Sequence, residues 1–147
     1  MKVLKCAIGE TSFGFELKRE IEEVIEAVEV RQFPGQKKQT IGFFNYRGRE
    51  IQLLDLAHIL KWKYSKEYVN RFIIVIKDKS FAFLVDHIDN IYDLPDEQME
   101  DPSDHKLPNG EMIAKVYVDE SYPIYEISKI LEKIKDGRKK HSKSKSA

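Results

Sequence analysis

The sequence predicts a mainly β protein built from two small barrels that pack together. Three observations support this prediction: short apolar runs alternate with tight turns, the 147 residues include 8 Phe and 7 Tyr, and the chain resembles itself internally. Aromatic and β-branched side chains favour strands because they pack well on a pleated surface. Each half holds too little chain for an open sheet with protected edges, so closed barrels are expected.

The internal resemblance has two parts, which lie in the two halves of the chain. SFGFEL at 12–17 matches SFAFLV at 80–85, and QLLDLAHIL at 52–60 parallels PIYEISKIL at 123–131. Chance similarity between apolar, β-rich segments is the alternative explanation. Between two similar barrels, a groove is the natural site for a ligand or a partner helix.

The N-terminal part of the chain begins with a predicted hairpin. Residues 3–8 form an apolar run, a polar turn begins at Gly9, and apolar residues alternate with others over 13–17. Between 18 and 30, helical and strand spacings of the apolar residues compete, so we expect a short helical turn that passes into a strand. A Pro-Gly pair at 34–35 ends this segment.

The stretch from 42 to 60 predicts a second hairpin followed by a short helix. Its apolar strands flank the turn Tyr46-Arg47-Gly48-Arg49, where glycine supplies the positive φ that a tight turn favours. Asp55 is suited to cap the helix that follows. The two arginines fit a recognition loop and an ordinary solvated turn equally well.

The rest of the chain predicts more strands, an acidic loop and a terminal helix. Strands are expected at 72–76 and 81–85, followed by apolar positions at Ile88, Ile91 and Leu94. A proline-containing acidic loop spans 95–109, and two further strands are expected at 113–118 and 122–125. An amphipathic helix over 127–134 ends the folded part, with Gly137 as its C-terminal cap. The basic, Ser-rich residues 137–147 predict a disordered tail. A solvated tail is favoured over one that contacts phosphate groups or an anionic membrane.

Composition argues against several classes of function. Lys plus Arg equals Asp plus Glu at 25 each, so the chain has no net positive charge that would attract nucleic acid. The single cysteine, Cys6, forms no internal disulfide, and the sequence has no signal-like or membrane-spanning apolar run. We therefore expect a cytoplasmic protein, with Cys6 as a small residue of the core.

Catalytic and metal-binding patterns are weak, and we expect no enzyme activity, no cofactor and no metal. The four histidines are not at ligand spacing: His58, His87, His105 and His141. Four acidic residues could form an acid pair or a weak cation site, but a solvated acidic edge is favoured: Asp86, Asp89, Glu97 and Glu100.

These features together resemble a known family, the CheW-type coupling domains of bacterial and archaeal chemosensory arrays. The family's Arg-Gly hairpin pattern is met by Gly42, Asn45, Arg47, Gly48, Asp55 and Leu56. Its second block is met by FAFLVDHIDNIYDLPDEQME at 81–100, and its early Val-x-Glu-Val segment is met by Ile21, Glu23 and Val24. The chain departs from the family pattern at Tyr46, Ala82 and the pair at 114–115.

The resemblance implies a fold of two intertwined five-stranded SH3-like β-barrels with short helices, including a C-terminal helix. The CheW-like domain would span 1–136, with subdomains at roughly 14–70 and 71–126 and with the N-terminal strand packed on the second. It also implies a non-enzymatic adaptor that couples chemoreceptors to the histidine kinase CheA. The partners would be the cytoplasmic tip of a methyl-accepting receptor and the regulatory domain of the kinase, assembled in an array beneath membrane-anchored receptors.

The resemblance also implies which residues bind. Receptor-binding residues would be Arg47, Asn45, Gly48, Glu23, Ile21 and Val24, with Val85, Ile88 and Tyr46 in the groove. Two other functions stay open at this point: a divergent CheW-like module with another signalling partner, and a small β-barrel protein that binds nucleic acid.

Overall fold

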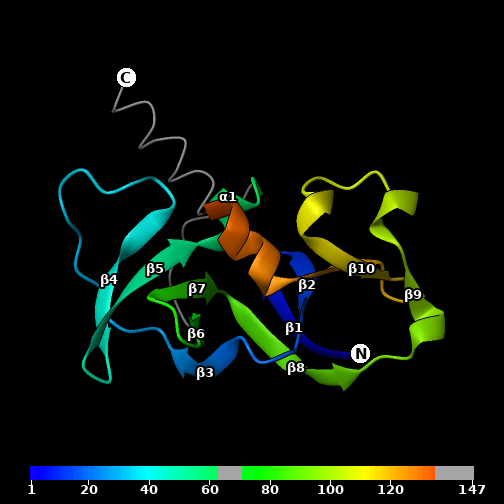
Figure 1. Ribbon diagram of the computed structural model, residues 1–147, viewed down its shortest axis with the longest axis horizontal. Coiled ribbons are helices and arrows are strands. Elements are labelled where there is room, and N and C mark those ends of the chain that lie inside the picture. The colour runs from blue at the N-terminus through cyan, green and yellow to red at the C-terminus, as the bar shows by residue number, and fades with distance from the viewer. Residues whose placement is uncertain (63–70, 135–147) are drawn as a thin grey trace.

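Two mixed β-sheets dominate the computed structural model, which describes residues 1–62 and 71–134 (Figure 1). The six-stranded sheet contains β1 (Lys2–Ile8), β2 (Thr11–Glu16), β8 (His87–Asp93), β9 (Met99–Glu100), β10 (Ile113–Tyr117) and β11 (Tyr122–Tyr125). The five-stranded sheet contains β3 (Ile21–Glu26), β4 (Thr40–Tyr46), β5 (Arg49–Asp55), β6 (Phe72–Ile76) and β7 (Phe81–Val85). The prediction of a mainly β fold is confirmed.

The two sheets repeat one arrangement of strands. Their orders are β8-β1-β2-β11-β10-β9 and β3-β6-β7-β5-β4, and each contains one parallel pair, β2 with β11 and β7 with β5. Gly14 pairs with Ile124 in the first, and Ala82 pairs with Leu53 in the second. These are equivalent positions of the two sequence motifs, so the predicted internal repeat is confirmed.

The repeat differs at Gly14, where the second half has Ala82. A Cβ atom added to Gly14 would lie 2.4 Å from Cγ1 of Val3, far inside van der Waals contact. Ala82 itself is fully buried in the interior of the five-stranded sheet. The six-stranded sheet therefore has no room for a methyl group at Gly14, whereas the five-stranded sheet accommodates the methyl group of Ala82 at the equivalent position.

The segment at 18–30 was wrongly expected to contain a helical turn. Residues 21–26 form β3 instead, which pairs with β6 along its length. A bulge between Ile21 and Glu23 shifts the register by one residue. Because a bulge inserts an extra residue, it breaks the two-residue alternation of a strand and leaves a spacing that resembles a helix.

The five-stranded sheet curls so that its two outer strands approach each other. Arg31, which follows β3, forms an isolated antiparallel bridge with Phe43 of β4, and each donates a backbone hydrogen bond of 2.8 Å to the other. Gly42 lies at this contact, since an added Cβ would come within 2.7 Å of the Arg31 carbonyl oxygen. The curl places the β4–β5 turn near β3, although the two are at opposite ends of the strand order.

Sheet membership divides the chain differently from the expected subdomains at 14–70 and 71–126. The five-stranded sheet uses residues 21–85, and the six-stranded sheet uses both 2–16 and 87–125. The reason is that β6 and β7 pair with β3 and β5. The parallel pairing of β5 with β7 needs a long crossover connection, which the chain between the two strands supplies.

Asp86 lies where the chain crosses from β7 to β8. Its carboxylate is 2.8 Å from Nε of the buried Arg71, which precedes β6, and it accepts a hydrogen bond of 2.6 Å from the Gly9 N–H in the β1–β2 turn. One carboxylate therefore ties the two sheets together. This structural role accounts for Asp86, which the sequence had also allowed as part of an acid pair or cation site.

A shared hydrophobic core lies between the two sheets. It combines buried side chains of β1, β2, β6 and β7 with those of the helices. Phe15 of β2 and Phe83 of β7 stack across it with ring centroids 6.0 Å apart. Further clusters fill each sheet, one around Phe44 and Ile51 and the other around Val3. Since burial of a large apolar side chain contributes about 2 kcal/mol, the shared core holds the sheets together.

The helices are short and lie where the sequence predicts them. Helix α1 (Leu56–Ile59) is capped by Asp55, whose side chain accepts a hydrogen bond of 3.3 Å from the His58 N–H. Residues 127–134 are helical, and their apolar positions face the shared core. The acidic loop contains the 3-10 turns η1 (Asp96–Gln98) and η2 (Pro102–Asp104), and a third turn, η3 (Gly110–Met112), follows it. Within 1–62 and 71–134, no helix is long and apolar enough to cross a membrane.

Two features predicted from the sequence lie outside the described residues. They are the cap at Gly137 and the tail at 137–147.

Candidate functional site

The β4–β5 turn presents Arg47 at its tip. Arg47 and Gly48 have φ values of 50° and 79°, so both occupy the left-handed region. The side-chain oxygen of Asn45 accepts a hydrogen bond of 3.1 Å from the Gly48 N–H and closes the turn. The Arg47 side chain is 67% exposed. Asn45 and Gly48 therefore set the shape of the turn, and Arg47 projects from it.

Tyr46 supports the turn from beneath. Its side chain is buried in the cluster that fills the five-stranded sheet, and its hydroxyl donates a short hydrogen bond to the Glu23 carboxylate. That bond raises the pKa of Tyr46 to about 12. The guanidinium of Arg47 lies over the ring, 5.1 Å from its centroid. Tyr46 is thus a packing residue, which corrects its expected place in an open groove.

Two carboxylates of β3 face the arginines of the turn. Arg47 lies 3.7 Å from Glu22 and 3.5 Å from Glu23, and Arg49 lies 3.0 Å from Glu22. Exposed ion pairs of this kind contribute little to stability, about 0–1 kcal/mol each. A carboxylate of a binding partner can therefore replace Glu22 or Glu23 at small cost, and Arg47 stays available.

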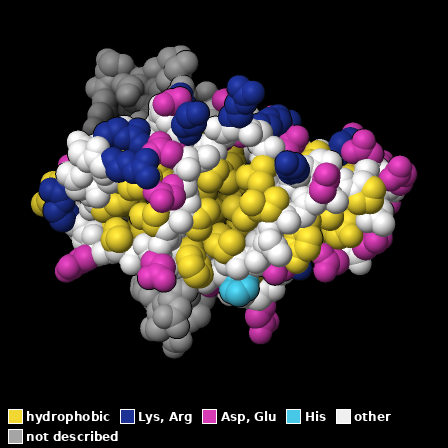
Figure 2. Space-filling model, turned by 90° about the horizontal axis from the view of Figure 1, so that it is seen from below, with side chains coloured by type: hydrophobic (Ala, Val, Ile, Leu, Met, Phe, Trp, Pro, Cys, Tyr) yellow, Lys and Arg dark blue, Asp and Glu magenta, His cyan; other side chains and the backbone are white. Residues whose placement is uncertain are grey.

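An apolar surface adjoins this charged turn. We call it the β3–β8 face, and it consists of Ile21, Val24, Ile88 and Ile91. β3 and β8 are outer strands of their sheets and lie on the same side of the molecule (Figure 1). From that side, hydrophobic side chains form a continuous area with acidic and basic side chains at its rim (Figure 2).

The exposed fractions within the β3–β8 face show which residues a partner can touch. Ile91 is 57% exposed, and Val24 is 37% exposed. Ile21 and Ile88 are half-buried and pack against the shared core.

Val85 does not belong to this surface, since it is 1% exposed within the shared core. Its expected place in the groove is therefore corrected.

Sequence reasoning missed several members of this site. Glu22 and Arg49 complete the charged cluster, and Ile91 extends the apolar face. The opposite charges in IEEV and RGRE are the only signal in the sequence for the first pair. That signal becomes usable only once the curl of the sheet brings β3 and the β4–β5 turn together.

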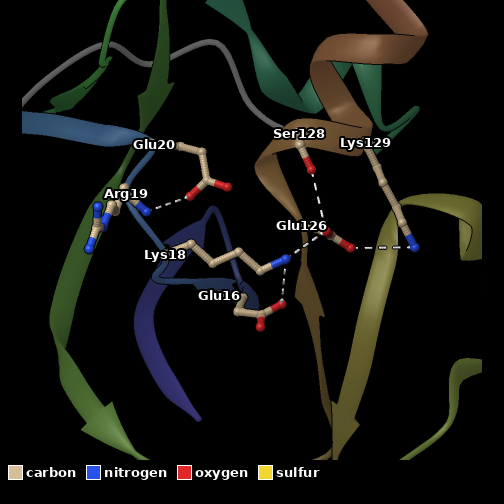
Figure 3. Close-up of polar contacts among 7 residues, drawn as sticks. All are labelled: Glu16, Lys18, Arg19, Glu20, Glu126, Ser128 and Lys129. Carbon is tan, nitrogen blue, oxygen red and sulfur yellow. Dashed lines mark hydrogen bonds and ion pairs between the residues drawn. The ribbon is translucent and has the colours of Figure 1, made fainter.

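A second polar network, centred on Glu126, is structural. Lys18 lies 2.8 Å from Glu126 and 3.9 Å from Glu16, while Lys129 and Ser128 also contact Glu126 (Figure 3). The hydrogen bond from Lys18 is the main reason why the pKa of Glu126 is lowered. The network joins the segment between β2 and β3 to the start of the terminal helix, and so fixes the helix against the sheets.

The described part of the chain, 1–62 and 71–134, offers no group of three or more His, Cys, Asp or Glu side chains that could hold a metal ion. Cys6 is buried in the shared core, and burial raises the pKa of its thiol. A neutral, enclosed thiol is a poor nucleophile.

Comparisons with known proteins agree with this geometry. A family model described as the CheW-like domain matches residues 2–135. The chemotaxis protein CheW of Thermotoga maritima is 29% identical over 100 residues, which cover 67% of this chain and 66%, just under two thirds, of that protein.

A solved structure has the same fold. The crystal structure of the scaffolding protein TtCheW from Thermoanaerobacter tengcongensis superposes with a TM-score of 0.72 over 85% of this chain and 86% of that one. The two sequences are 16% identical, so this likeness concerns the fold alone.

Proposed function

Because the chain belongs to the CheW-like domain family, we propose that it is a non-enzymatic scaffold of chemotaxis that couples chemoreceptors to the histidine kinase CheA. The family match over residues 2–135 supports the role of scaffold. The scaffold acts by holding two partners at once, which needs accessible surfaces and no catalytic group. We place it in the cytoplasm, in arrays beneath membrane-anchored receptors.

The observation that carries the proposal is the exposed Arg47 beside the apolar β3–β8 face. Docking of an amphipathic helix uses apolar anchors for affinity and charges at the rim for register. The receptor tip is such a helical partner. Val24 and Ile91 are accessible as anchors, and Arg47 is accessible to a receptor carboxylate.

The proposed receptor site keeps most of the residues expected from the sequence. Its members are Ile21, Glu23, Val24, Asn45, Arg47, Gly48 and Ile88, to which Ile91 is added. Glu23 acts by holding Arg47 and Tyr46 in place. In this proposal, the regulatory domain of the kinase binds at the ends of the two sheets.

Co-sedimentation tests the proposal directly. The purified chain is mixed with receptor-containing membranes and kinase from the same genome, and the kinase bound to membranes is measured with and without the chain. We expect Arg47→Glu to weaken recruitment of the chain because it reverses the exposed charge of the turn. Lys106→Glu is the matched control, since Lys106 is exposed and lies in the acidic loop. Equal recruitment of both variants and the wild type would refute the assignment of Arg47.

A further inference from the structure

A separate concave site lies away from the β3–β8 face. In Figure 1 helix α1 and the terminal helix lie above the sheets, whereas β3 and β8 lie below. The pocket has a volume of about 470 Å³ and is formed by three segments distant in the sequence. Its lining residues are Lys37, Lys38, Gln39, His58, Ile59, Lys61, Lys133 and Ile134. We call it the lysine pocket.

Positive charge gathers at the lysine pocket although the whole chain has a net charge of zero. Among the described residues, four lysines and a histidine line it, and no acidic residue does. Lys37 and Lys38 form no ion pair with any residue of the described ranges, and both are exposed. Since Lys37 and Lys38 each carry a compact charge that no described carboxylate neutralises, the pocket favours an anion with several charges.

The loop that carries Lys37 and Lys38 is held in place before any ligand arrives. The Gln36 side chain donates to the Thr40 carbonyl at 3.0 Å, and the Thr40 N–H donates to the Lys37 carbonyl at 2.9 Å. The Asp55 N–H donates to the Gln39 carbonyl at 2.7 Å, which joins the loop to the start of α1. An ordered loop lowers the entropy cost of gathering charges around a ligand.

A carboxylate at the edge of the pocket shows that its lysines attract anions. Glu111 lies 2.8 Å from Lys133. Its pKa is lowered chiefly by the hydrogen bond from Lys133, with a further contribution from the charge of Lys61. Glu111 therefore competes with any ligand for Lys133.

We propose that the lysine pocket binds a small molecule that carries a run of phosphates. Lysine is a common phosphate ligand, and several lysines around one concavity match a compact polyphosphate better than an isolated phosphate. The apolar Ile59 and Ile134 in the lining can also contact an organic group attached to the phosphates. Inorganic tripolyphosphate and a nucleoside triphosphate share this chemistry. The proposal is independent of the receptor site.

Titration calorimetry of the full chain at low salt tests the proposal with both compounds. Saturable binding of tripolyphosphate is expected, and Lys37→Glu with Lys38→Glu should weaken it by about tenfold or more. The matched control is Lys77→Glu with Lys79→Glu, which makes the same change of charge on the exposed β6–β7 turn. The β6–β7 turn lies at the start of β7, whereas α1 follows the end of β5. Because β5 and β7 run parallel, the turn and α1 lie at opposite ends of these two strands, so the control substitutions are away from the lysine pocket. Melting temperatures of both variants establish that they are folded.

A second variant gives a result in the opposite direction. Glu111→Gln removes the competing carboxylate from Lys133 and should strengthen binding several-fold. Tighter binding of the nucleoside triphosphate than of tripolyphosphate would show that the pocket also contacts the organic group, and equal binding would show that it recognises the phosphates alone. Either result supports the proposal. The proposal is overturned if neither compound shows saturable binding, or if the two double lysine variants lose affinity equally.

Discussion

Loss of the Asp86 side chain should loosen the two sheets from each other. Asp86→Ala removes an ion-pair partner of Arg71, whose side chain is 5% exposed, and the acceptor of the Gly9 N–H. Breaking a buried ion pair from one side costs about 3–5 kcal/mol because it leaves a buried charge uncompensated. The Asp86 side chain is 27% exposed, so water partly screens the pair and we expect about 2–3 kcal/mol.

The effect can be measured by urea unfolding and by thermal melting. A domain of this length loses about 2–4 °C of melting temperature per kcal/mol, so Asp86→Ala should lower it by roughly 4–12 °C. Asp86→Asn keeps an acceptor for Gly9 but loses the charge, and should fall between Asp86→Ala and the wild type. Asp93→Ala is the control, because the Asp93 side chain is 78% exposed. If Asp86→Ala melts within 1 °C or so of the Asp93→Ala control, the carboxylate does not tie the sheets together.

Three further predictions concern other parts of the molecule. Glu126→Gln should lower the free energy of unfolding by about 0.5–1 kcal/mol at neutral pH. It should also reduce the dependence of stability on acid pH. Because the pKa of Glu126 is lowered in the folded state, the stability that its charge contributes is present above about pH 4.3 and is lost as the pH falls through the folded pKa. Urea titrations at several pH values would show this, and parallel acid limbs in variant and wild type would contradict it. Gly14→Ala should cost about 1–3 kcal/mol because its Cβ meets Val3, whereas Gly110→Ala, with open space around it, should leave the urea midpoint nearly unchanged. Ile91→Asp should weaken recruitment to receptor membranes with little change in melting temperature, since Ile91 is 57% exposed; a large fall in melting temperature would instead make it part of the core.

Local features of the fold could be predicted because they depend on neighbours in the sequence. The two hairpins, the Asp55 cap and the terminal helix follow from turn residues and apolar spacing. The strand at 21–26 was misread because its bulge breaks the alternation that identifies strands. The assignment of β6 and β7 to the five-stranded sheet depends on pairing between distant segments, which hydrophobic pattern alone does not encode.

The candidate site was predicted in part for the same reason. The Arg47 turn is a local motif, so its shape and exposure follow from the sequence. Burial of Tyr46 and Val85 depends on how the sheets curl and pack, and their apolar character fits a core and a groove equally well. Glu22 joins the site only through tertiary structure, because β3 and the β4–β5 turn meet there from separate parts of the chain.

The division of strands between the sheets has a consequence for synthesis of the protein on the ribosome. All strands of the five-stranded sheet have been made once residue 85 has emerged, and its pairings join segments within 21–85. The hairpin of β1 and β2 is made first, yet its partners β8 and β11 are made only after the five-stranded sheet is complete. Closure of a long loop slows folding, so the N-terminal hairpin has its apolar face uncovered while the five-stranded sheet assembles. The beginning of the chain thus gains its full set of neighbours only when β11, near the other end, has been made.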